Sequence, residues 1–276
     1  MSVSFITTHF HDVGWTERLI RQLRITTPRD AIAEILVVDQ DRTRASAERL
    51  SALDRAVRVV QYPRSPRHFE WTRHDHAAVL NRVVTEARGE LICLFDSDAH
   101  PITAAWWPQV MELLHSHDAV LARERGTDFS HPCFMVFAAT QGPGLRFDEG
   151  LFTEHLRDTG RMIARQLLDR GQRVCLLAPE EAFGGRFGSV YLGCIYHHGK
   201  GVFAGVDDPL LQRQIGWEHR WYRARVLEDE TYELTWPRRL QLLSVRVGRR
   251  FLRAVSAALA RLEAVDRAEP AKTEPD

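Results

Sequence analysis

Residues 74–101 have the sequence HDHAAVLNRVVTEARGELICLFDSDAHP, and this stretch carries the strongest indications of the fold. Its first half repeats apolar side chains at the spacing of one helix face, which predicts a helix over 75–88. Its second half is an apolar run, 91–95, that predicts a buried strand and ends at Asp96 and Asp98. A helix followed by a buried strand is the repeating element of parallel sheets.

The segments on the N-terminal side repeat the same alternation. Apolar β-branched runs predict strands, and helical spacing of apolar residues predicts helices. In chain order these are the strand 3–10, the helix 15–25, the strand 34–41, the helix 43–54 and the strand 57–62. Because parallel strands need such crossovers, the sequence predicts an α/β protein with a mixed, mostly parallel sheet flanked by helices.

The alternation of strands and helices is less regular after residue 100. The expected elements are a helix at 104–116, strands at 119–122 and 133–138, a helix at 158–170 and a strand at 173–178. From residue 209 the chain becomes helical and arginine-rich, and its end has the composition of a disordered tail. We therefore predict an α/β domain over 1–205, a helical C-terminal extension over 206–265 and a tail over 266–276.

Composition excludes several classes of protein. The 276 residues contain 37 Lys and Arg against 37 Asp and Glu, and 44% are hydrophobic. This balance argues against a dedicated nucleic-acid binder, an acidic disordered chain and a multispan membrane protein.

The four cysteines are widely separated, so we expect small core residues in a reducing compartment rather than disulfides or metal ligands. With no leader-like N-terminus, this indicates a cytoplasmic location.

One basic amphipathic segment leaves two interpretations open. Residues 237–262 pair an apolar face with repeated arginines. Such a helix can pack on the catalytic domain or on a second subunit. It can also contact an anionic membrane, which would make the protein peripheral at the inner membrane face.

The acids after the strand 91–95 are the sharpest chemical feature. The glycine patterns of dinucleotide-binding domains and of P-loop proteins are absent. Asp96 and Asp98 form a D-x-D motif, and two carboxylates at a strand end can hold a hard divalent cation that neutralises a diphosphate. The structural alternative is a solvated turn in which Asp98 caps the following helix.

At this point the chain resembles the family 2 glycosyltransferases of the GT-A (Rossmann-like) fold. The resemblance covers residues 3–205 and rests on the segments SFITTHF, EILVVDQD, HDHAAVLNRVVTEARGELICLFDSDAHP, FDEGLF and YHHGKG. It implies an enzyme that depends on Mg²⁺ or Mn²⁺ and moves a sugar from a nucleoside-diphosphate sugar to an acceptor hydroxyl with inversion. The acceptor could be a glycan, a lipid carrier or a small molecule.

The resemblance also implies roles for donor-side residues of this chain. Thr8 would line the base pocket and Asp39 would contact the nucleobase, Asp96 would contact the ribose or nucleotide, and Asp98 would hold the cation. His197 would complete the metal or diphosphate site, with His198 as its alternative. The segment 9–12, HFHD, departs from the aromatic-Asn pair usual in the family.

The residues expected on the acceptor side match the family pattern less well than those on the donor side. An inverting transfer needs a base for the acceptor hydroxyl. The family's Glu-Asp pair is not intact in the segment 152–160, FTEHLRDTG, where Asp158 is the first candidate base and Glu154 the second. Asp158 is equally suited to N-cap the following helix. Trp106 and Trp107 could stack an acceptor sugar, but their spacing favours the core.

Two other classes stay open from the sequence. A phosphohydrolase of the haloacid-dehalogenase type would use one aspartate of the motif at 96–98 as a nucleophile. That motif usually follows the first strand, whereas here it follows the fourth predicted strand. A catalytically inactive module that only binds a nucleotide sugar is the other alternative.

Overall fold

The structure, a computed structural model, describes residues 1–10, 13–41, 45–62, 73–149, 159–181 and 188–199. The chain divides into two compact units, and the described residues all belong to the first, Met1–Ala182 with Phe187–Gly205. The predicted C-terminal extension and tail lie outside the described residues, as does the basic segment 237–262. Among the described helices, none has both the length and the apolar composition needed to cross a bilayer.

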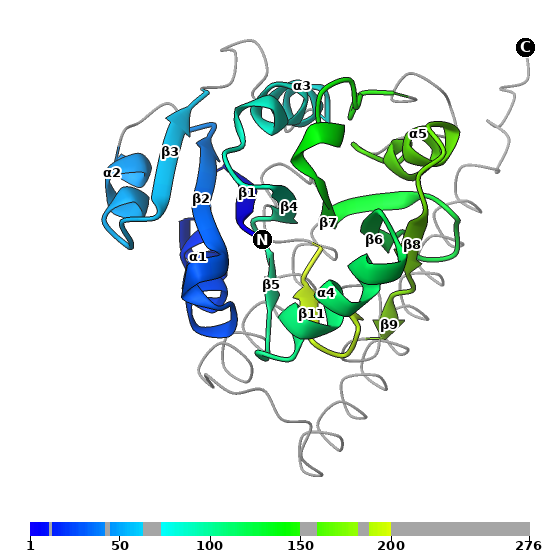
Figure 1. Cartoon of the computed structure of the whole chain (residues 1–276). Helices are drawn as coiled ribbons and strands as arrows, with labels where there is room; N and C mark the ends of the chain where they lie inside the picture. Colours follow the sequence, from blue (N-terminus) through cyan, green and yellow to red (C-terminus); the bar gives the residue numbers. More distant parts are fainter. Residues whose placement is uncertain (11–12, 42–44, 63–72, 150–158, 182–187, 200–276) are drawn as a thin grey trace, which may run out of the picture. The chain divides into compact units, whose positions relative to one another are not determined.

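The described unit is built on a seven-stranded sheet with the order β3-β2-β1-β4-β7-β6-β8 (Figure 1). Four of its neighbouring pairs are parallel, and β7 pairs antiparallel with both β4 and β6. The predicted mixed, mostly parallel sheet is therefore confirmed. The strands are β1 Val3–His9, β2 Ile32–Asp39, β3 Val57–Gln61, β4 Leu91–Asp96, β6 Ala119–Arg123, β7 Ser130–Ala138 and β8 Val174–Leu177.

Helices cover both faces of this sheet because successive strand residues point to opposite sides. Phe5 of β1 belongs to one apolar core cluster and Ile6 to the other. The first cluster includes residues of α1 (Val13–Thr26), α2 (Ala45–Ser51) and α4 (Trp106–Ser116). The second includes residues of α3 (Arg73–Val83) and α5 (Ile163–Asp169). Figure 1 shows α3 and α5 on one side of the sheet and α1 and α4 on the other.

A second, four-stranded sheet was not foreseen from the sequence. It has the order β5-β11-β10-β9, with all pairs antiparallel. Its strands are short: β5 Ala99–Pro101, β9 Glu180–Glu181, β10 Ser189–Tyr191 and β11 Ile195–His197. Because β5 begins three residues after the end of β4, this small sheet brings β11 to the carboxyl end of β4.

The helix predicted over 75–88 is shorter at its C-terminal end. The helix α3 ends at Val83 and continues as the 3-10 turn η2, Val84–Glu86. Gly89 then runs against β1, where an added Cβ would lie 2.5 Å from the Ser4 backbone nitrogen. Only glycine permits this close approach of two backbones, which explains why position 89 is a glycine.

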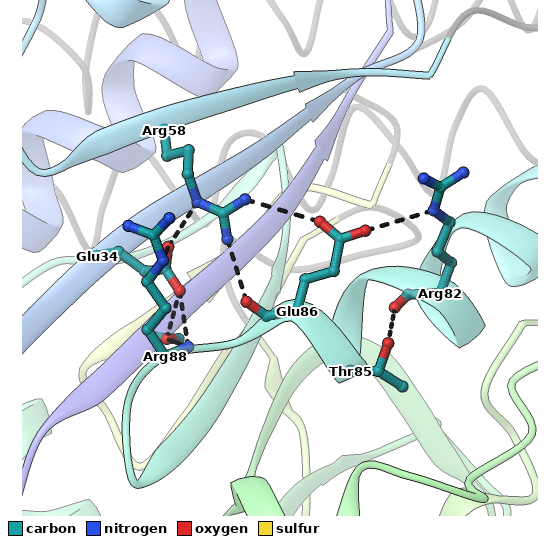
Figure 2. Close-up of polar contacts among 7 residues, drawn as sticks. Glu34, Arg58, Arg82, Thr85, Glu86 and Arg88 are labelled. Atoms are coloured by element: carbon teal, nitrogen blue, oxygen red, sulfur yellow. Dashed lines mark hydrogen bonds and ion pairs between the residues drawn. The ribbon is translucent and has the colours of Figure 1, made fainter.

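Glu34 of β2 is the centre of a polar cluster near the amino ends of the parallel strands (Figure 2). Its carboxylate accepts hydrogen bonds from Ser4 Oγ at 2.9 Å, Arg58 Nε at 2.8 Å and the Arg88 amide at 2.9 Å. Burial opposes the charge of Glu34, but these hydrogen bonds outweigh it and hold the pKa below its ordinary value of 4.5. Arg58 Nη1 also lies 3.7 Å from Glu86 Oε2. Figure 2 draws this ion pair as a dashed line.

We expect Glu34→Gln to lower the free energy of unfolding by about 1–3 kcal/mol, because a buried acceptor of several hydrogen bonds becomes a partial donor. Since the folded-state pKa is lowered, the contribution of the carboxylate is present above pH 4.5 and is lost as the pH falls below it. Urea denaturation at several pH values measures both effects. Glu112→Gln, at a side chain 82% exposed, is the control. Equal stability of the two variants would contradict this role.

Candidate active site

The carboxyl ends of β1, β2 and β4 meet at one edge of the sheet. The register aligns His9 with Asp39 and Thr8 with Asp96. In an open α/β sheet, this edge is where ligands bind. The predicted donor-side residues of these strands are therefore neighbours in the fold.

Asp96, Asp98 and His197 form the first group at this edge. His197 Nε2 lies 3.7 Å from Asp96 Oδ2 and 3.5 Å from Asp98 Oδ1. One ligand atom from each residue lies within 4.8 Å of the others, so the three could hold a metal ion. The alternative in which Asp98 caps a helix is wrong, because Asp98 is followed by the strand β5 and α4 begins only at Trp106.

The charges of the residues in this group depend on one another. Burial raises the pKa of Asp96 to about 7, against an ordinary value of 3.8. Burial disfavours a charged His197, yet Cys133 and Asp98 outweigh it and raise the pKa of His197 well above 6.5. The buried Asp98 and the partly buried Asp96, next to one imidazole, form a donor set of oxygen and nitrogen atoms that fits Mn²⁺ or Mg²⁺, whose charge would compensate both acids.

The adjacent histidines have different surroundings. His197 is the last residue of β11 and lies against the carboxylates. His198 stacks on Trp15 with ring centroids 4.9 Å apart, and its Nδ1 forms a hydrogen bond with the Tyr196 hydroxyl at 2.9 Å. Of the two, His197 is the one that the strand pairing brings to the D-x-D motif.

Asp39 lies in a separate hydrogen-bonded network. It is fully buried and accepts hydrogen bonds from Gln61 Nε2 at 2.7 Å and the Asp41 amide at 3.0 Å, and burial raises its pKa. His9 bonds with Thr16 through Nδ1 and with Asp41 through Nε2. His9, Asp39 and Asp41 could group around an ion, but this use of their polar atoms favours a structural network.

Asn81 of α3 joins the segment 74–101 to the segment FDEGLF, residues 147–152, through hydrogen bonds. Its Oδ1 accepts a hydrogen bond from the Phe147 amide at 2.7 Å, and its Nδ2 donates to Asp148 Oδ1 at 2.9 Å. The helix α3 therefore anchors the FDE segment, residues 147–149. The candidate bases Asp158 and Glu154, which follow that segment in the sequence, lie outside the described residues.

Sequence reasoning missed two residues beside the first group. His131 and Cys133 lie two positions apart on β7, and the ring of His131 is 5.0 Å from that of His197. Burial opposes ionisation of Cys133, but His197 and His131 outweigh it and lower its pKa to about 6. Burial also disfavours a charged His131, but Cys133 raises its pKa to about 9. The only sequence signal was the i, i+2 spacing, which places two strand residues on one face.

The parallel β-α-β sheet, with carboxylates at the ends of β2 and β4, defines an α/β domain of the class that binds ligands at the carboxyl edge of its strands. Within it, residues 6–137 match the family model of glycosyl transferase family 2. The match identifies this part of the chain as a family 2 glycosyl transferase domain. A comparison with curated proteins finds no match.

Several solved structures are similar to the chain. The mannosyltransferase PcManGT from Pyrobaculum calidifontis, in complex with GDP-Man and Mn²⁺, has 17% identity and a TM-score of 0.48 over 98% of this chain and 76% of its own. S. aureus TarS 1–349 has 16% identity and a TM-score of 0.48 over 91% and 72%. Glucosyl-3-phosphoglycerate synthase from Mycobacterium tuberculosis, with Mn²⁺, UDP and phosphoglyceric acid, has 15% identity and a TM-score of 0.47 over 64% and 68%. The family assignment rests on the sequence match.

Proposed function

We propose that the protein is a metal-dependent, inverting glycosyltransferase that moves a sugar from a nucleoside-diphosphate sugar to an acceptor hydroxyl. The observation that carries the proposal is the group Asp96, Asp98 and His197 at the carboxyl edge of a family 2 sheet. Mg²⁺ or Mn²⁺ is the cofactor that its oxygen-rich donor set favours.

Each donor-side residue has a role in this proposal. Asp98 and His197 hold the cation, and Asp96 contacts the nucleotide beside it. Thr8, aligned with Asp96 on the neighbouring strand, lines the base pocket. Asp39 contacts the nucleobase at the end of β2, where its own hydrogen bonds fix its orientation. When bound, the cation supplies positive charge that stabilises the leaving diphosphate.

The acceptor side requires a base. In a single displacement, the acceptor oxygen bonds to the anomeric carbon as the bond from that carbon to the diphosphate breaks. A carboxylate takes the acceptor proton during this step. We propose Asp158 for this role, with Glu154 as the second candidate; both follow the FDE segment that Asn81 anchors.

The partners and the location belong to the same proposal. The acceptor is a glycan, a lipid carrier or a small molecule, and a cytoplasmic enzyme would meet each of these. The basic segment 237–262 would give a peripheral contact with the inner membrane face if the acceptor is lipid-linked. The proposed donor-side and acceptor-side residues all fall within 1–205 under either arrangement.

A thermal-shift panel of UDP, GDP and dTDP, each with and without Mn²⁺, tests the donor side. We expect one nucleotide to raise the Tm by about 5–10 °C when present at about 100 times its dissociation constant, and to do so only with Mn²⁺. The metal requirement follows because the two acids repel a diphosphate unless a cation lies between them. Equal shifts with and without metal, or no shift with any nucleotide, would contradict the proposal.

A further inference from the structure

A second group of metal-binding side chains overlaps the first. One ligand atom from each of His131, Cys133 and His197 lies within 4.8 Å of the others. Two of these residues come from β7 and one from β11, so they are far apart in sequence and are brought together by the fold. Neither a nucleotide nor an acceptor is needed to explain such a cluster, and the proposed transfer gives no role to His131 or Cys133.

The chemistry of this group differs from that of the D-x-D motif. A thiolate and two imidazoles are soft and borderline ligands, which select zinc-like ions and not Mg²⁺. Cys133 is fully buried, and like the other described cysteines it is not in a disulfide. The Cys133 amide donates to His131 Nδ1 at 3.1 Å and so holds this imidazole beside the thiol.

We propose that His131, Cys133 and His197 bind a borderline-soft divalent cation of the zinc class, with Asp96 or Asp98 as the fourth ligand. In a tetrahedral zinc site, bonds of about 2.0–2.3 Å place ligand atoms about 3.3–3.6 Å apart. The observed upper limit of 4.8 Å requires a contraction of about 1 Å, within the reach of side-chain rotation.

His197 belongs to both groups, so the two ions compete for it. A zinc ion held by Cys133 would remove an imidazole from the donor cation, and zinc would then reduce Mn²⁺-dependent nucleotide binding. The zinc site itself does not depend on the proposed transferase function, because its ligands and its spectroscopic signature involve no nucleotide.

Titration of the metal-free, full-length protein with Co²⁺ tests the proposal, because cobalt replaces zinc and reports on its ligands. We expect a sulfur-to-cobalt charge-transfer band in the near ultraviolet and strong visible bands of tetrahedral cobalt, both removed by added Zn²⁺. Cys133→Ser should lose the charge-transfer band and weaken Co²⁺ binding at least about 100-fold. Cys175→Ser, on β8, is the matched control and should keep both.

Absence of the charge-transfer band in the wild type, or its persistence in Cys133→Ser, would overturn the zinc site. If Cys133→Ser does not fold, His131→Asn gives the second test, since loss of one imidazole should weaken Co²⁺ binding while the sulfur band remains at saturation. The nucleotide panel separates the two proposals. Mn²⁺-dependent nucleotide binding without the sulfur band refutes only the zinc site, and the reverse result refutes only the donor site.

Discussion

Asp98→Asn is expected to abolish Mn²⁺-dependent nucleotide binding and to lower the rate of sugar transfer by about a thousandfold or more. The carboxylate is one of two acids that lie against His197, at 3.5 Å from its Nε2. An amide keeps the shape but loses the negative charge that a divalent ion requires. A metal ion contributes several kcal/mol to the stabilisation of a leaving diphosphate, and about 1.4 kcal/mol corresponds to a tenfold change in rate.

The measurement uses the nucleotide identified by the thermal-shift panel and its sugar donor. Asp118→Asn is the control, because Asp118 pairs with Arg173 at the surface and lies outside both metal groups. Asp98→Asn should keep its fold, since Asp98 lies in the turn between β4 and β5 and belongs to neither apolar core cluster. Unchanged nucleotide binding by Asp98→Asn, or full transfer in excess chelator, would contradict the metal-dependent mechanism. Nucleotide binding by the wild type without transfer would indicate a binding module.

The first half of the sheet could be predicted from the sequence because three of its strands, β1, β2 and β4, are largely buried, while β3 is a partly buried edge strand. The predicted strands 3–10, 34–41, 57–62 and 91–95 correspond to β1, β2, β3 and β4. Continuous apolar runs of this kind are typical of parallel strands, and the helices between them carry one apolar face. Their order also placed Asp39 and Asp96 at a common edge, which the register confirms.

The small second sheet could not be predicted, because its strands have only two or three residues and show no periodicity. Its pairing of Ala99 with His197 joins residues far apart in sequence. The sequence therefore named His197 through the family resemblance, but only the fold separates it from His198. The contact of His131 and Cys133 with His197 depends on the same pairing. The sequence predicts all four cysteines to be simple core residues, so it does not predict this cluster.

The helix predicted over 158–170 is shorter in the structure, and the sequence pattern did not predict where it begins. The helix α5 runs only from Ile163 to Asp169, and Gly160 before it has a φ of 71°. A residue with positive φ cannot be part of a right-handed helix, so the helix begins after this glycine. Asp158 therefore does not directly precede α5, and its assignment as the base stays a prediction.

The helical spacing of Trp106 predicts a position in the core, and the structure confirms this prediction. Trp106 is fully buried and Trp107 is 8% exposed, so neither presents a ring for stacking an acceptor sugar. The Trp106 ring lies 6.0 Å from Phe5, 5.9 Å from Phe95 and 5.4 Å from Trp107, measured between centroids. These aromatic side chains join α4 to the strands β1 and β4, whose carboxyl ends form the candidate site.

Trp106→Ala should therefore lower the free energy of unfolding by about 3–5 kcal/mol, the usual cost of removing a buried aromatic side chain. Its Nε1 donates to Thr26 Oγ1 at 3.1 Å, so the variant also loses a buried hydrogen bond. Because a domain of this size is stable by about 5–15 kcal/mol, such a loss is a large fraction of the total. Trp106→Phe, which keeps most of the ring packing, is the matched variant and should cost less. Urea denaturation measures both. Near wild-type stability of Trp106→Ala combined with loss of transfer would instead assign this tryptophan to the acceptor, since a side chain that only fills the core affects transfer through stability alone.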